Sequence, residues 1–119
     1  MADEDDEEMN ESEEIAFGLI STAGTARSLY MNAMKAAREG QFDQADDLMK
    51  QAEEPSLEAH NVQTQLLVNE AQGHHIPVDV LLVHSQDHLM DSIAVGDLAV
   101  EIIALYKKID ELEKKIDAK

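Results

Sequence analysis

The sequence has no cysteine and no tryptophan, and its only phenyl rings belong to two phenylalanines and two tyrosines among 119 residues. The absence of cysteine excludes disulfides, thiolate zinc sites and cysteine nucleophiles, and it is typical of a reducing cytoplasm. Apolar runs are short, because none approaches the roughly 20 residues that a transmembrane helix needs. The acidic N-terminus is the opposite of the basic start of a signal peptide. We therefore expect a cytoplasmic protein with no direct membrane insertion.

Basic residues are scarce as well. The chain has 9 lysines and arginines against 26 acidic residues, so its formal charge is −17. We expect no nucleic-acid partner, because such binding depends on neutralising phosphates with positive charge. Nine of the acidic residues lie in the first fourteen positions, and so dense a charge run has little to bury. This pattern predicts an acidic disordered tail over residues 1–11 and a single domain over residues 12–119.

Two prolines and five glycines divide the rest of the chain at few places. Apolar residues recur at helical spacing over residues 15–40 and again over residues 42–73, and each stretch ends at a glycine. Asp43 is a candidate cap for the second stretch, in which Pro55 predicts a kink within one helix. A third helix is expected from Pro77 to the C-terminal lysines. With its aliphatic composition, the chain predicts an all-α fold, a three-helix up-down bundle.

The third predicted helix carries apolar residues on two faces. One face is a seven-residue repeat typical of a coiled coil, here called the seam: Val95, Leu98, Ile102, Leu105, Ile109, Leu112 and Ile116. The other face, roughly opposite, is a second apolar stripe: Leu82, Leu89, Ile93, Val100 and Ile103. One small protomer cannot cover both faces, so we expect one to pack inside the protomer and the other to form a homo-oligomer.

Polar residues occupy the seam positions that precede Val95. At about 100° per residue, His84, Asp87, His88 and Asp91 lie on one stripe of the third helix. Such groups need partners when they are buried. They could be satisfied interhelical contacts that fix register, or ligands of a metal ion, or the site of nucleophilic histidine chemistry. The di-metal carboxylate pattern is not met, because the second helix lacks the matching Glu-x-x-His spacing.

The position of His84 near the start of the third helix supports nucleophilic chemistry at this residue. A neutral imidazole attacks phosphorus well near neutral pH, and a second ring or a carboxylate can orient it. His84 comes about two turns after Pro77, where the amides of a helix start favour a phosphoryl group. The sequence has no phosphate-binding glycine loop of its own. Any phosphoryl group would therefore arrive on another protein.

Three segments resemble one known family. The segment Val83-His84-Ser85-Gln86-Asp87-His88-Leu89-Met90 is similar to the active-site signature of the lactose/cellobiose-type enzyme IIA of the bacterial sugar phosphotransferase system. Residues 24–28 (Gly-Thr-Ala-Arg-Ser) and residues 58–64 (Glu-Ala-His-Asn-Val-Gln-Thr) match the same family at the expected relative positions. The resemblance extends from about Ile15 to Leu112, and the valine before His84 leans towards the cellobiose/chitobiose branch.

The resemblance implies a homotrimer of three-helix protomers that carries phosphoryl groups. His84 would take a phosphoryl group from the histidine phosphocarrier protein and pass it to the cysteine of a IIB subunit, which feeds the membrane IIC subunit. Gln86 and His88 would line the site. Asp87 would bind a divalent cation, with Mg²⁺ expected, together with its two copies at the trimer axis. Asp91 stands where the family commonly has threonine, and it adds negative charge two turns from the phosphoryl site.

A different class of function stays open at this stage. The seam alone would suit a helical oligomerisation or adaptor protein with no chemistry. The other histidines carry no functional prediction. We expect His60 to make a buried or half-buried hydrogen bond, and we expect His74 and His75 to be exposed in a loop.

Overall fold

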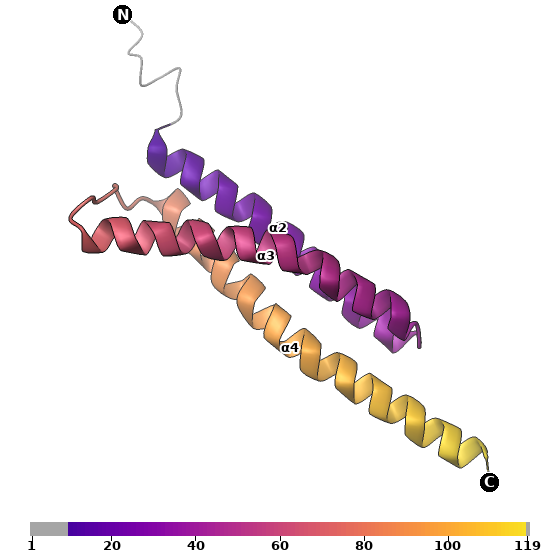
Figure 1. The fold of residues 1–119 in the computed structure, drawn as a ribbon. Helices are drawn as coiled ribbons and strands as arrows, with labels where there is room; N and C mark the ends of the chain where they lie inside the picture. Colours follow the sequence, from indigo (N-terminus) through magenta and orange to yellow (C-terminus); the bar gives the residue numbers. More distant parts are fainter. Residues whose placement is uncertain (1–9, 119) are drawn as a thin grey trace, which may run out of the picture.

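The structure is a computed structural model that describes residues 10–118 and consists of three α-helices with no strand among these residues (Figure 1). They are α2 (Glu11–Arg38), α3 (Phe42–Ala71) and α4 (Val80–Asp117). The predicted all-α bundle is confirmed. The predicted tail falls mainly on residues 1–9, which lie outside the described residues. None of the described helices has a stretch long and apolar enough to cross a membrane.

Helix α2 begins earlier than the apolar pattern predicted. Asn10 is its N-cap: the Asn10 side-chain oxygen accepts a hydrogen bond from the backbone amide of Glu13 at 2.9 Å, and the Asn10 side-chain Nδ2 donates to the Glu13 carboxylate at 3.2 Å. The first bond satisfies one of the amides that the first turn leaves free. Glu11, Glu13 and Glu14 therefore lie in the first turn of the helix, where they complement its dipole.

Helix α3 is continuous through Pro55, as predicted. Its N-cap is Gln41, which makes no side-chain capping bond, so the prediction of Asp43 as the cap is wrong and this residue lies in the first turn. Both predicted glycine stops are confirmed, because Gly40 and Gly73 have φ of +77° and +86°, which glycine adopts at little cost.

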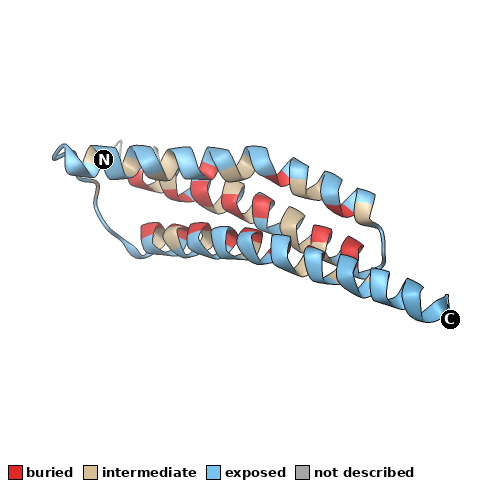
Figure 2. Ribbon diagram, turned by 60° about the horizontal axis from the view of Figure 1, so that its bottom comes forward, coloured by how far each residue is buried: buried red, intermediate tan, exposed pale blue. Residues whose placement is uncertain are grey.

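Helix α2 is the central element of the bundle, since it packs along both of its neighbours while α3 and α4 touch each other little. Helices α2 and α4 run in parallel, so the Ser12 hydroxyl meets the Pro77 carbonyl at 3.2 Å near one end, and Ala37 and Ile103 share a core cluster at the other end. The core is rich in alanine, which lets the helices approach closely. Figure 2 shows the buried residues gathered on the facing sides of the helices.

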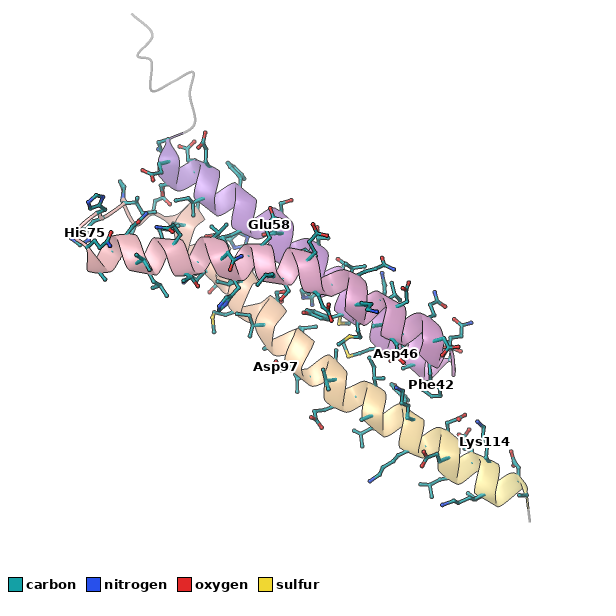
Figure 3. The ribbon with its side chains drawn as sticks, viewed as in Figure 1. Phe42, Asp46, Glu58, His75, Asp97 and Lys114 are labelled. Carbon is teal, nitrogen blue, oxygen red and sulfur yellow. The ribbon has the colours of Figure 1, made fainter. Side chains whose placement is uncertain are left out.

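The two apolar faces of α4 differ in how far they are buried. Leu82, Leu89 and Ile103 of the second stripe are buried inside the protomer, but Ile93 and Val100 of the same stripe are 38% and 56% exposed because α3 does not close over them. The seam stays open: Leu98 and Leu105 are 57% and 59% exposed. Tyr106 still packs on the core and Lys107 lies 3.4 Å from Asp46, but the last turns of α4, where Lys114 lies, project past the ends of the other helices (Figures 1 and 3). One protomer therefore leaves the seam without a partner.

Candidate functional site

The site begins at the N-terminus of α4. Asp79, not Pro77, starts the helix: its carboxylate accepts a hydrogen bond from the Leu82 amide at 2.8 Å. The prediction of Pro77 in the first turn is wrong, because the chain stays non-helical up to Asp79. His84 is thus the fifth residue of α4, about one turn from its start. This is closer to the free amides of the helix end than the sequence suggested.

His84 and His88 form a pair one turn apart on α4. Their Nε2 atoms are 3.1 Å apart, their ring centroids are separated by 4.6 Å, and the rings meet edge to face at 88°. His84 is exposed and His88 is half-buried. A hydrogen bond between these atoms needs one Nε2–H donor and one Nε2 acceptor, and the tautomers of the two rings decide which ring donates.

Asp91 continues the stripe and pairs with another helix. Its Oδ2 atom is 2.7 Å from Nε of Arg27 on α2, and both side chains are about half exposed. The negative charge that Asp91 adds to the stripe is therefore compensated within the protomer. In the sequence, Arg27 stands out only as part of the family motif at residues 24–28. A signal for it was present, since Arg27 is the first lysine or arginine of the chain.

Asp87 is exposed, and no group of three or more potential metal ligands exists within residues 10–118. A cation at Asp87 would therefore need ligands from other copies of the chain. Its carboxylate is the kind of hard oxygen donor that magnesium prefers. The donor chemistry fits the predicted ion, and each protomer would contribute a single residue.

Gln86 lies apart from the histidines. Residues two positions apart in a helix point about 200° apart around its axis. Gln86 therefore lies on the flank of α4 opposite His84. Ile93 shares this flank and lines an open groove of about 610 Å³ with Leu57 and His60 of α3. The Nε2 atom of Gln86 is buried and has no hydrogen-bond partner among the described residues. The structure thus brings together His84 and His88, but it does not bring Gln86 to them within one protomer.

The remaining histidines have no part in this cluster. His60 is exposed on the groove between α3 and α4, so the prediction of a buried or half-buried hydrogen bond is wrong. Ala59, one residue earlier, takes the core position. His74 and His75 are exposed in the loop, as predicted, and Nδ1 of His75 lies 2.8 Å from Oε2 of Glu70. Figure 3 shows His75 at the end of the bundle where α3 turns back.

Comparison with known sequences gives consistent matches. Residues 14–107 match the family model described as "PTS system, Lactose/Cellobiose specific IIA subunit". The lactose-specific EIIA component of Streptococcus mutans is 43% identical over 94 residues, which cover 79% of this chain and 90% of that protein. The lichenan-specific phosphotransferase enzyme IIA component of Bacillus subtilis is 44% identical over 104 residues, which cover 87% of this chain and 94% of that protein.

Solved structures agree with these matches. The crystal structure of the cellobiose-specific enzyme IIA from Bacillus anthracis aligns with a TM-score of 0.84 and 45% identity, and the alignment covers 88% of this chain and 96% of that chain. A chain in the solution structure of the IIA(Chitobiose)–HPr complex of Escherichia coli aligns with a TM-score of 0.71 and 40% identity over 85% of this chain and 98% of that chain. The similarity therefore extends over most of the three-helix bundle.

Proposed function

Because the chain belongs to the lactose/cellobiose-specific IIA family of the sugar phosphotransferase system, we propose that it is a phosphocarrier that acts through His84. The observation that carries this proposal is the pair of imidazoles, 3.1 Å apart between Nε2 atoms, with His84 exposed near the start of α4. An exposed ring can reach a phosphohistidine on another protein. A buried ring could not.

The proposed step moves one phosphoryl group between two nitrogen atoms. In one tautomer, Nε2 of His84 accepts a hydrogen bond from Nε2–H of His88. When this hydrogen bond is released, the lone pair of His84 Nε2 attacks phosphorus as the P–N bond to the donor histidine breaks. The His88 N–H then donates to a phosphoryl oxygen in place of the ring nitrogen. In the second transfer, the P–N bond to His84 breaks and a P–S bond to the cysteine of a IIB subunit forms. His88 would thus stabilise the group on His84 without reacting.

The partners in this proposal are the histidine phosphocarrier protein, a IIB subunit and, through it, the membrane IIC subunit. The histidine phosphocarrier protein (HPr) is supported as a partner by the E. coli neighbour, whose solution structure is a IIA–HPr complex. The sugar would be a β-linked disaccharide of the cellobiose/chitobiose or lactose type, in line with the named relatives. The carrier would work in the cytoplasm and would never touch the sugar.

Assembly as a homotrimer is part of the proposal. It is supported by the open seam on α4, where Leu98 and Leu105 are more than half exposed. Asp87 would then hold a divalent cation, Mg²⁺, jointly with its copies, and the ion would neutralise their charge. Gln86 would line the site as a supporting residue, although its buried Nε2 atom has no partner among the described residues of one protomer.

A phosphorylation assay tests this function. The protein is incubated with phosphoenolpyruvate and the general phosphotransferase proteins, and acid-labile label is measured. We expect His84→Gln to abolish labelling, because glutamine has no nucleophilic ring nitrogen, and His88→Gln to label about tenfold more slowly. His60→Gln is the matched control and should label like the parent. A parent that takes no label would favour the adaptor function, and equal labelling of the first two variants would exclude His84 as the nucleophile.

A further inference from the structure

Positive charge is distributed unevenly along the bundle. Of the nine lysines and arginines, Arg27 alone precedes Lys35, and α4 carries none before Lys107. Lys50 of α3 lies beside Met49, which packs on the core cluster of Ala33 and Ile103 at the far end. Since α2 and α4 are parallel, the ion pair with Asp91 places Arg27 on the histidine side of Lys35 and Lys107. Within residues 10–118, no other lysine or arginine of α2 or α4 lies on that side.

Arg27 forms an ion pair with Asp91. The Arg27 Nε atom donates to Asp91 Oδ2 at 2.7 Å. Asp91 follows His84 by seven residues, which is about 10 Å along the helix and on the same face. The other ionisable groups near the stripe are Asp87 on α4 and, across the opposite flank, Glu53 and His60 of α3. A phosphoryl group on His84 would bring two negative charges close to this set, in which Arg27 is paired with Asp91 and any ion at Asp87 would be a second counter-charge.

We propose that Arg27 is a positioning residue of the phosphoryl site, which acts through Asp91 to set how readily His84 keeps a phosphoryl group. The inference rests on the proposed phosphocarrier function. While the ion pair is intact, the electrostatic potentials of Arg27 and Asp91 nearly cancel at the position of His84. Without Arg27, an unpaired carboxylate about 10 Å away repels the phosphoryl dianion, and phosphoryl transfer to His84 becomes less favourable.

The test measures the equilibrium of phosphoryl exchange between phosphorylated HPr and the protein, at low ionic strength and one fixed magnesium concentration. For unit charges at this distance, we expect Arg27→Gln to lower the equilibrium constant about threefold and Asp91→Asn to raise it about threefold. The double variant should return to the parent value. Arg27→Lys, which keeps the charge, should also match the parent. In high salt these differences should shrink, because screening shortens the reach of the charges.

A matched control is available in the second inter-helix ion pair. Lys107 on α4 lies 3.4 Å from Asp46 on α3 and is similarly exposed, but it is 23 residues beyond His84. Lys107→Gln changes the net charge by the same amount and should leave the equilibrium unchanged. Circular dichroism and thermal melting verify that every variant keeps its fold.

The outcomes separate the two proposals. A phosphorylated parent with an unchanged Arg27→Gln equilibrium overturns the inference alone. So does an equal effect of Lys107→Gln, or a double variant that keeps the defect of Arg27→Gln. A parent that takes no phosphoryl group overturns the phosphocarrier function, and the inference with it.

Discussion

The ring of Tyr30 on α2 lies directly against Gly96 on α4. A Cβ atom built at Gly96 would come within 2.8 Å of Cε2 and Cζ of this ring, which is closer than real contacts allow. Tyr30 also lines the groove between α3 and α4, at the level of Ile93. Glycine at this position thus lets a large ring fill the space between two parallel helices that are otherwise held by alanines.

We predict that Gly96→Ala destabilises the protein even though alanine is the better helix former. Alanine gains up to about 1 kcal/mol of helix propensity, while forcing the Tyr30 ring out of its contact costs about 1–3 kcal/mol. The free energy of unfolding in urea measures the balance. Gly18→Ala on α2 is the control, because a Cβ there meets nothing within 4 Å, and this variant should be stabilised. If Gly96→Ala is stabilised as much as Gly18→Ala, the close contact with Tyr30 does not constrain this position.

The N-terminal cap of α4 gives a second prediction. Asp79→Ala removes the acceptor of the Leu82 amide and should lower the free energy of unfolding by about 1 kcal/mol. Asp79→Ser keeps an oxygen acceptor without the charge, so it should retain most of the stability. Chemical denaturation of the three proteins distinguishes capping from charge. If Asp79→Ser loses as much free energy of unfolding as Asp79→Ala, then the negative charge at the start of α4, and not the hydrogen bond, stabilises the helix.

The periodicity of the sequence was sufficient to predict three helices and the two apolar faces of α4, because helix faces follow from residue spacing alone. Boundaries were less predictable. Asn10 caps α2 among acidic residues that look like a tail, and only its two hydrogen bonds with Glu13 show where the helix begins. Asp79 replaces Pro77 at the start of α4 for a similar reason: a local hydrogen bond decides the boundary.

Side-chain environment depended on tertiary packing that no local pattern contains. His60 follows the core residue Ala59, and it is exposed because α3 and α4 leave a groove between them. The histidine pair could be placed from its four-residue spacing within one helix. Arg27 and Asp91 could not be paired in that way, since 64 residues separate them and only the parallel alignment of α2 and α4 brings them together.

The seam provides a prediction about assembly. We expect Leu105→Asp to convert the assembly to monomers, because it places a charge in an apolar helix interface at each copy. Leu67→Asp on α3 is the matched control, since Leu67 and Leu105 are both 59% exposed in the protomer and Leu67 lies outside the seam. Sedimentation equilibrium gives the mass of each variant. Parent-like mass for Leu105→Asp, or dissociation of Leu67→Asp alone, would place the interface elsewhere than at the seam.

The last prediction concerns the Asp87 carboxylate and its copies. If the assembly brings these carboxylates together, like charges at close range repel by several kcal/mol unless an ion or protons neutralise them. Asp87→Leu removes this repulsion and should raise the melting temperature in EDTA. Magnesium should stabilise the parent, by about 2.7 kcal/mol at a hundredfold excess over its dissociation constant, and should leave the variant unchanged. Asp97→Leu, which removes another exposed carboxylate of α4 (Figure 3), is the control and should keep the full response to magnesium. If Asp87→Leu melts lower than the parent in EDTA, or responds equally to magnesium, then Asp87 is not at a cation-dependent junction between subunits.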